Sequence, residues 1–216
     1  MERSRPKTLE PSKIAVLKLL LATNNQGKIR ELGSLIASDA WELTTPAQEG
    51  IDIEVKETGK TSEENAAIKA AAYAKASNLI AIADDSGLEV EALSGEPGVL
   101  SARYAGEGAS DRERLVYLLT KLSGVPWGER KARFRCIIAI AFPDGRVELC
   151  QGECPGVIAF EPRGENGFGY DPIFHLPEFA KTMAELNFEE KNRISHRGKA
   201  VRKALEILES SVSRGA

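Results

Sequence analysis

The hydrophobic pattern of this chain changes between two periods, which predicts strands alternating with helices. Short apolar or alternating runs predict strands over residues 14–22, 51–55, 79–83, 134–142, 147–151 and 156–160. Apolar positions three and four residues apart predict helices over residues 28–36 and 111–122, and in the C-terminal segment from about residue 195. An Ala-rich segment predicts another helix over residues 61–77. Because helices follow strands early and a hairpin comes later, we expect an α/β protein with a mixed sheet.

Local signals support several of these boundaries. Thr61-Ser62-Glu63-Glu64 has the Ser/Thr-x-x-Glu form of a capping box and opens an Ala-rich segment. Pro143-Asp144-Gly145 predicts the turn of a hairpin. Ser195 is expected to cap the last helix, whose apolar positions face inward.

Length and composition predict one soluble globular domain over residues 14–216, preceded by a flexible, polar leader over residues 1–13. The chain has 216 residues, 42% of them hydrophobic, and no apolar stretch long enough to cross a bilayer. Its net charge of −3 gives no indication of a broad nucleic-acid surface. Three cysteines without a secretory signal favour a reducing cytoplasm, and their spacing disfavours a zinc site.

Two adjacent carboxylates, Asp84 and Asp85, follow the apolar run of residues 79–83. Ser86-Gly87 comes next and predicts a turn, so the pair is expected where a buried strand ends. Two like charges there are costly unless a cation compensates them, and a divalent metal would do so, because hard cations prefer such oxygen ligands. The alternative is a solvated turn with two exposed aspartates.

The segment Thr23-Asn24-Asn25-Gln26-Gly27-Lys28 lies between a predicted strand and a predicted helix. Its small polar residues, glycine and lysine at a helix start suit a phosphate group. A P-loop is disfavoured, since it would need Gly in place of Ala22 and Ser or Thr in place of Ile29. The alternative is an ordinary strand-to-helix loop.

Two further segments carry candidate chemistry. Glu57 precedes the capped helix, on which Asn65 and Lys69 share a face, although both could simply belong to a solvated surface. In Gly167-Phe168-Gly169-Tyr170-Asp171 the flexible backbone lets aromatic rings approach a flat ligand, but the rings could equally fill the core.

Lys191 and Ser195-His196-Arg197-Gly198 gather cations and donors around the start of the last helix. Cations at a helix N-terminus oppose the helix dipole, so the helix itself does not explain them. This mismatch indicates a functional role.

These motifs, taken in order, resemble the inosine/xanthosine triphosphate pyrophosphatase family (Ham1-like). They are Thr-Asn-Asn-x-Gly-Lys, Glu-Thr-Gly, Asp-Asp-Ser-Gly-Leu, Gly-Phe-Gly-Tyr-Asp-Pro and Ser-His-Arg-Gly. The segment Pro97–Tyr104 also matches the family pattern Pro-Gly-x-x-Ser-Ala-Arg-Tyr. The resemblance runs from about Leu19 to about Leu208.

The resemblance implies an elongated mixed sheet flanked by helices, with two lobes and the active-site cleft between them. It implies a homodimer that hydrolyses ITP, dITP and XTP to the monophosphate and pyrophosphate with Mg²⁺. Asp85 would be the proton acceptor, and Glu57, Asp84 and Asp85 the metal ligands. Asp84 could instead be a buried acceptor that supports the turn. The implied substrate-binding residues are Thr23, Asn24, Asn25, Gln26, Gly27, Lys28, Lys69, Ser86, Phe168, Gly169, Tyr170, Asp171, Lys191, His196 and Arg197.

Three other functions compete with this one. A Maf-like nucleotide pyrophosphatase would share the fold but prefer other bases, and Ser195-His196-Arg197 argues against it. A nucleotide-binding module without catalysis is disfavoured by the intact carboxylates and Lys28. An RNA-binding protein is disfavoured by the net charge of −3 and the lack of a basic stripe, so neither nucleic acid nor a membrane is expected as a partner.

Overall fold

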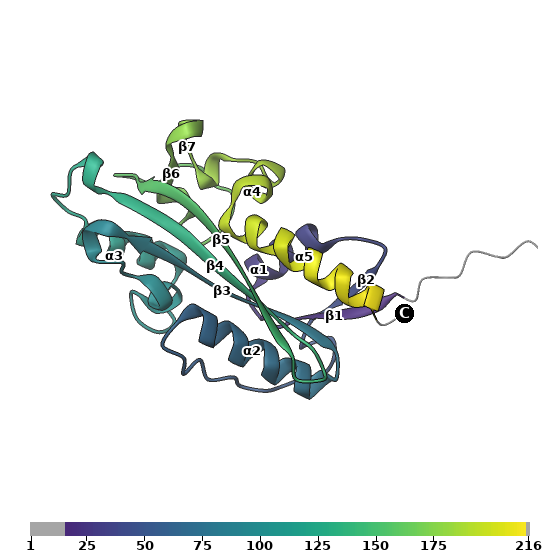
Figure 1. Ribbon diagram of the computed structural model, residues 1–216. Helices are drawn as coiled ribbons and strands as arrows, with labels where there is room; N and C mark the ends of the chain where they lie inside the picture. Colours follow the sequence, from purple (N-terminus) through teal and green to yellow (C-terminus); the bar gives the residue numbers. More distant parts are fainter. Residues whose placement is uncertain (1–15, 215–216) are drawn as a thin grey trace, which may run out of the picture.

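Seven strands form one mixed sheet in the computed structural model, which describes residues 16–214 (Figure 1). The strand order is β2-β1-β3-β4-β5-β6-β7, with β1 parallel to both neighbours and all other pairs antiparallel. The strands are β1 (Leu17–Leu21), β2 (Trp41–Thr44), β3 (Ile80–Val90), β4 (Lys131–Ala141), β5 (Val147–Ile158), β6 (Phe174–Leu176) and β7 (Lys181–Thr182).

The helices of the described chain lie on both sides of this sheet. The α-helices are α1 (Gln26–Ile36), α2 (Ser62–Ser77), α3 (Asp111–Lys121), α4 (Phe188–Ile194) and α5 (His196–Arg214). Short 3-10 helices are η1 (Glu91–Leu93), η2 (Gly98–Arg103), η3 (Trp127–Glu129), η4 (Asp171–Ile173), η5 (Pro177–Phe179) and η6 (Met183–Glu185). None of the helices within residues 16–214 has both the length and the hydrophobicity to cross a bilayer.

The sheet is elongated because its outer strands join at opposite ends of three long central ones. Strands β3, β4 and β5 pair along almost their whole length. Strand β1 pairs with β3 only at Ile80–Ile82, whereas β6 pairs with β5 only at Val157–Ile158. The expected elongated, mixed sheet flanked by helices is confirmed.

Helix α2 covers one face of the sheet, and α1 and α5 cover the other (Figure 1). Leu32 and Val201 pack with Ile82 on the α1–α5 side, while Ala70 packs with Ala83 on the α2 side. A third cluster, beneath α3 at the other end of the sheet, includes Leu88, Leu118 and Phe174. Burying each such leucine stabilises the fold by about 1.5–3 kcal/mol.

The predicted turn at Ser86-Gly87 is wrong, because β3 continues through these residues to Val90. Ser86 pairs with Cys136 and Gly87 with Arg135 of β4. The polar residues remain in the strand because protein groups compensate them and β4 supplies the backbone hydrogen bonds. Consecutive side chains of a strand point to opposite faces, so Asp84 faces α1 and α5, whereas Asp85 faces α2.

Other predicted boundaries also differ from the structure. Residues 51–55 form no strand, and β2 is the strand that pairs with β1. The strands predicted at 147–151 and 156–160 are one strand, β5, because β4 pairs with it continuously from Val147 to Val157. Helix α4 was not predicted. The leader of residues 1–13 lies outside the described residues.

Candidate active site

A cleft along β3 brings most of the predicted site residues together. Those that line it are Asn25, Lys28, Glu57, Lys69, Asp85, Ser86, Phe168, Gly169, Tyr170, Asp171, Lys191, His196 and Arg197. Thr23, Asn24, Gln26, Gly27 and Asp84 do not line it, and Gly27 borders a neighbouring hollow together with Phe168. Segments far apart in the sequence thus meet at the middle of the sheet.

The loop before α1 uses its polar side chains to present the helix start. Asn25 caps α1, its Oδ1 accepting a hydrogen bond from the Lys28 amide at 3.0 Å, and Thr23 Oγ1 accepts one from the Asn25 amide at 3.2 Å. Gly27 is required by a close approach, since a Cβ there would lie 2.6 Å from the Phe168 ring. The loop therefore fixes the start of α1 so that Asn25 and Lys28 line the cleft.

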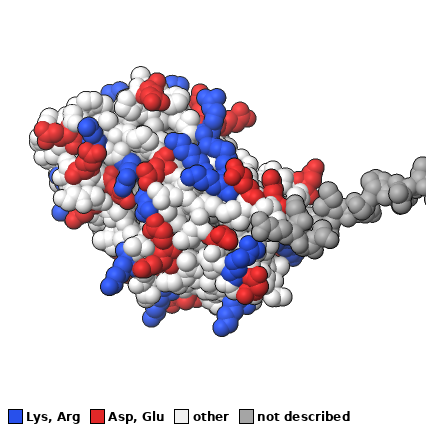
Figure 2. Space-filling view, viewed as in Figure 1, with Lys and Arg blue, Asp and Glu red and all other residues white. Residues whose placement is uncertain are grey.

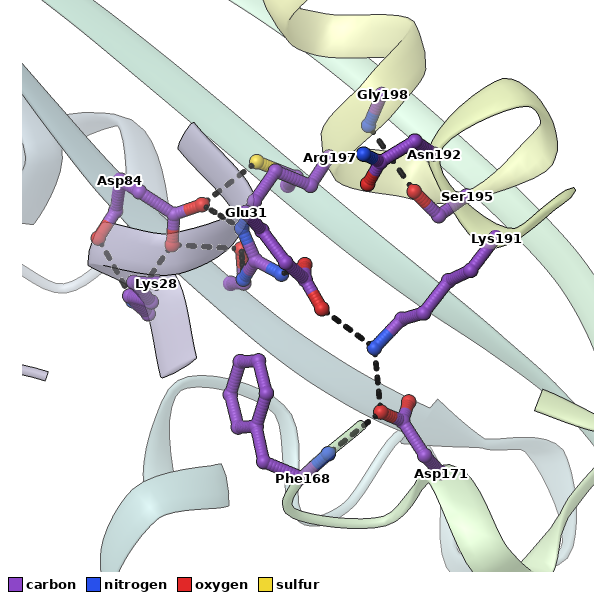
Figure 3. Close-up of polar contacts among 12 residues, drawn as sticks. Lys28, Glu31, Asp84, Phe168, Asp171, Lys191, Asn192, Ser195, Arg197 and Gly198 are labelled. Carbon is purple, nitrogen blue, oxygen red and sulfur yellow. Dashed lines mark hydrogen bonds and ion pairs between the residues drawn. The ribbon is translucent and has the colours of Figure 1, made fainter. Parts of the chain in front are cut away.

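Asp84 is fully buried and holds groups from α1, β3, β4 and α5 (Figure 3). Its Oδ1 accepts from Lys28 Nζ at 2.5 Å and Ser86 Oγ at 2.8 Å, and its Oδ2 accepts from Arg197 Nε at 2.7 Å and Cys136 Sγ at 3.2 Å. Burial alone would raise the pKa of Asp84, but the two cations outweigh it and hold that pKa well below its usual range.

This contact belongs to a buried chain of alternating charges (Figure 3). In order, the chain is Asp171, Lys191, Glu31, Arg197, Asp84 and Lys28. Lys191 Nζ lies 2.5 Å from Asp171 Oδ2 and 2.6 Å from Glu31 Oε1, and Glu31 Oε2 accepts from Arg197. Removing one member would leave a buried charge without its partner, at a cost of about 3–5 kcal/mol.

Glu31 was not among the predicted site residues, although it links Lys191 to Arg197. It is 3% exposed, and the two cations lower its pKa although burial alone would raise it. The sequence does contain a signal: Glu31 interrupts the apolar stripe of α1, next to Leu32 and four residues before Leu35. A carboxylate within such a stripe indicates a buried partner.

Asp85 lies on the opposite face of β3 and has a different environment. Burial raises its pKa, against the opposing effects of Lys28 and a hydrogen bond with Ser62. Within residues 16–214 its buried Oδ2 has no hydrogen-bond partner. Glu57, which also lines the cleft, forms an ion pair with Lys69 of α2. Asp85 thus has an acceptor oxygen available, which Asp84 does not.

The start of α2 agrees largely with its sequence signal. Thr61 Oγ1 accepts from the Glu64 amide at 3.2 Å, so Thr61 is the cap. The carboxylate of Glu64 accepts from the Lys60 amide, one residue earlier than a capping box requires. Asn65 Oδ1 accepts from the Gly59 amide at 2.8 Å, which ties the segment after Glu57 to the helix that carries Lys69.

The loop of residues 162–171 forms another wall of the cleft. Asp171 Oδ2 accepts from the Phe168 amide at 2.8 Å, and burial raises the pKa of Asp171 despite Lys191 beside it. The Phe168 ring is half-buried, with Lys191 Nζ 5.1 Å from its centroid. Tyr170 packs into the hydrophobic core and also lines the cleft. Of the two roles considered for the rings, contact with a flat ligand or filling of the core, the Tyr170 ring therefore has the second.

His196 and Arg197 enter the cleft from the first turn of α5. Ser195 Oγ accepts from the Gly198 amide at 3.1 Å, as a cap does. His196 is 4% exposed, its ring stacks on Phe134, and its Nδ1 has no partner among the described residues. Burial and then Arg197 hold the pKa of His196 well below its usual range, so the ring is neutral at pH 7.

A last wall of the cleft comes from η2 and the start of α3, which the predicted site did not include. Its lining residues are Val99, Ser101, Ala102, Arg103, Asp111 and Arg114. Asp111 Oδ2 accepts from the Gly169 amide at 2.7 Å, which joins this wall to the loop of residues 162–171. The motif of residues 97–104 was the available signal, but no role was attached to it.

Comparison with known proteins agrees with this geometry. The model of the Ham1 family matches residues 19–207. A dITP/XTP pyrophosphatase of Desulforamulus reducens is 52% identical over 192 residues, which cover 89% of this chain and 96% of the relative. One from Thermus thermophilus is 55% identical over 190 residues, covering 88% and 91%.

Solved structures give the same result. The Ham1 protein of Staphylococcus aureus superposes with a TM-score of 0.80 at 45% identity, covering 90% of this chain and 99% of that one. A HAM1 protein from Coxiella burnetii gives a TM-score of 0.81 at 42% identity, with the same coverage. The motifs, the sheet and the family model agree, and this chain belongs to the Ham1 family.

Proposed function

We propose that this chain hydrolyses the deaminated purine nucleoside triphosphates dITP, XTP and ITP to the monophosphate and pyrophosphate. One arrangement carries the proposal: Asp85, with its unpartnered oxygen, shares a cleft with Lys28, Lys69 and an aromatic loop. The names of the relatives, dITP/XTP pyrophosphatase, support the same activity and substrates.

The phosphate chain is expected at the loop of residues 23–28, with Lys28 and Lys69 beside it. A triphosphate carries roughly three to four negative charges, and enzymes that cleave such chains act mainly by positioning and by charge neutralisation. The start of α1 adds the positive end of the helix dipole at this place. In this assignment Asn25 and Lys28 contact phosphate. The other residues of the segment shape the loop: Thr23, Asn24, Gln26 and Gly27.

The residues present fit a Mg²⁺ ion at Glu57 and Asp85. The unpartnered buried Oδ2 of Asp85 is an oxygen ligand without a protein partner in the described chain, and Glu57 adds a second carboxylate. No group of three or more His, Cys, Asp or Glu side chains suited to a metal occurs within residues 16–214. A site with only two carboxylates suits Mg²⁺, because Mg²⁺ keeps several waters and commonly takes one or two carboxylates plus substrate phosphates.

When bound, Mg²⁺ would neutralise phosphate charge and make a water more acidic. Asp85 would then accept the proton of the attacking water, with Ser86 next to it in the cleft. For Asp84 the contacts favour the anchoring role, since both of its oxygens already hold Lys28, Arg197 and neighbouring donors. Its role as a metal ligand stays a prediction.

The purine is expected beside Phe168, with Lys191, His196 and Arg197 facing its edge. Hypoxanthine and xanthine have a carbonyl at C6, which accepts hydrogen bonds, whereas adenine has an amino group there. A pocket of donors therefore leaves adenine with mismatched groups, and each mismatch costs about 1–3 kcal/mol. The fixed loop of residues 167–171 holds the ring and the backbone donors in place.

The decisive experiment is a parallel assay of dITP, XTP, ITP, dGTP and ATP, with Mg²⁺ and with Mg²⁺ chelated. We expect release of pyrophosphate from the first three, at least about 100-fold preference over ATP, and loss of turnover on chelation. Preferred cleavage of a canonical triphosphate would contradict the substrate assignment. Tight binding of XTP without turnover would instead indicate a nucleotide-binding module.

We also propose a cytoplasmic homodimer, as the family resemblance implies, without nucleic acid or membrane as partner. The described cysteines, Cys136, Cys150 and Cys154, are all free thiols, which suits a reducing compartment. On the face shown in Figure 2, red and blue side chains are mixed except for one group of blue ones above the centre, and the net charge of the chain is −3. Light scattering at working concentration tests the dimer.

A further inference from the structure

Arg103, at the end of η2, lines the cleft without a partner. It is exposed, and no hydrogen bond or ion pair joins its side chain to any residue from 16 to 214. Every other Lys or Arg of the cleft lining is paired: Lys28 with Asp84, Lys69 with Glu57, Arg114 with Asp111, Lys191 with Glu31 and Asp171, and Arg197 with Glu31 and Asp84.

We propose that Arg103 binds the phosphate chain of the substrate as a further substrate-binding residue. The proposal rests on the proposed function, because it takes the triphosphate to lie in this cleft. Arginine suits the task, since its planar guanidinium can donate two parallel hydrogen bonds to phosphate oxygens.

The charge balance of the cleft explains why such a residue is needed. The paired cations have their charge neutralised by the carboxylates that hold them, two of which, Glu31 and Asp84, lie behind the lining. Those pairs orient the cations but offer little net attraction to a polyanion. Lys28 and Lys69 can still contact phosphate, but in the described lining Arg103 is the cation whose charge no carboxylate partner offsets.

The segment that carries Arg103 is fixed on the face of β3 that also presents Asp85. Ser101 Oγ accepts from the Leu88 amide at 2.9 Å and donates to the Gly98 carbonyl at 2.6 Å. A Cβ at Gly87 would lie 2.5 Å from the Gly98 carbonyl oxygen, so η2 packs directly on the strand there. Because residues 85 and 87 share a face of β3, Arg103 and Asp85 border the cleft from the same side of the sheet.

The residues just before Arg103 are also held from α3 and from the loop of residues 162–171. Arg114 donates to the Ala102 carbonyl at 2.9 Å, and the Tyr170 hydroxyl donates to the Ser101 carbonyl at 3.0 Å. The backbone is thus fixed while the Arg103 side chain stays free of internal ion pairs. Binding phosphate would break no existing contact of Arg103, which favours affinity.

The test compares Arg103→Ala and Arg103→Lys with Arg112→Ala. Arg112 is a matched control, because it is an exposed arginine of α3 without a partner in the described chain and does not line the cleft. We expect Arg103→Ala to lower kcat/KM for dITP and XTP by about 10- to 100-fold. Arg103→Lys should recover part of the loss, and Arg112→Ala should stay within about twofold of the unchanged protein.

A second readout does not depend on the base or on turnover. Inorganic tripolyphosphate with Mg²⁺ should raise the thermal unfolding temperature of the unchanged protein and of Arg112→Ala. For Arg103→Ala the increase should be clearly smaller. Without ligand all three should unfold alike, since Arg103 has no contact to lose. Unchanged kcat/KM and unchanged stabilisation in Arg103→Ala would overturn the proposal. If the unchanged protein cleaves neither dITP nor XTP, the proposed function fails, while the tripolyphosphate comparison still decides whether Arg103 binds phosphate.

Discussion

At the scale of single residues, the neighbours Asp84 and Asp85 differ in role. The same Asp→Asn substitution should lower stability at one position and turnover at the other. The same strand turns one carboxylate toward Lys28 and Arg197 and the other toward the α2 side of the cleft. Asp84 has its oxygens fully engaged, whereas Asp85 keeps an oxygen without a partner in the described chain. Their side chains are chemically identical, so only the environment distinguishes them.

Asp85→Asn should abolish turnover while leaving the fold intact. An amide cannot accept the proton of the attacking water, so we expect kcat to fall by about 10²- to 10⁴-fold. The free energy of unfolding should stay within about 1 kcal/mol of the original, because Asp85 takes no part in the buried chain of charges. Pyrophosphate release and urea unfolding measure the two effects.

Asp84→Asn is the contrasting substitution, and it should cost stability first. It leaves Lys28 and Arg197 without the charge they face, at about 3–5 kcal/mol. If Asp84→Asn unfolds like the original protein, or Asp85→Asn keeps near-normal turnover, the roles assigned to the two residues are wrong.

At the scale of elements, helices were predicted better than strands. Helices α1 and α3 follow the hydrophobic period, whereas α2 follows its cap signal and its alanine content, and the Thr61 cap forms as predicted. The end of β3 was mispredicted because Asp84-Asp85-Ser86-Gly87 is polar in sequence. What keeps these residues in the strand is distant in the chain: β4, Lys28 and Arg197. Pattern alone cannot show such partners.

The site itself was predictable wherever a motif carried it. The loop at Lys28 and the segments at Phe168 and His196 all reach the cleft as expected. Glu31 and the wall formed by η2 and α3 were missed, because the stripe position of Glu31 and the motif of residues 97–104 do not show which distant elements these residues contact.

The packing of α5 on β5 is an element-level feature that places His196 and Arg197. A Cβ at Gly152 would clash with the His196 carbonyl oxygen and lie 2.6 Å from the Ala200 amide nitrogen. Gly152→Ala should therefore push the start of α5 off the sheet. We expect a loss of about 1–3 kcal/mol in the free energy of unfolding and a raised KM for XTP.

Gly33→Ala is the matched control for this change. A Cβ at Gly33 meets nothing within 4 Å, and the residue lies inside α1, where alanine is favoured by about 0.5–1 kcal/mol. It should stabilise the protein and leave KM unchanged. Equal effects of the two substitutions would mean that close packing at Gly152 does not position α5.

At the scale of the whole molecule, the buried chain of charges connects segments that hydrophobic packing alone would not place. It begins at Asp171, at the end of the loop of residues 162–171, and continues through Lys191 of α4 to Glu31 of α1. From Glu31 it continues through Arg197 of α5 and Asp84 of β3, and it ends at Lys28 of α1. Three anions and three cations alternate, so the chain is neutral as a whole. Its carboxylates take up protons at low pH, which leaves the cations unbalanced, so the stability of the protein should depend on pH.

Glu31→Gln should remove a part of the stability that depends on pH. The cations around Glu31 lower its folded pKa, so its contribution is present above its unfolded value, about 4.3, and is lost as the pH falls through the lower folded value. At pH 7 we expect Glu31→Gln to cost about 3–5 kcal/mol in urea unfolding, and the gap to the original protein to narrow below about pH 4. Burial raises the pKa of Asp171, which acts in the opposite direction, but this contribution is common to both proteins and largely cancels in the comparison. A gap that stays constant from pH 7 to pH 3 would show that the charge of Glu31 does not stabilise the fold.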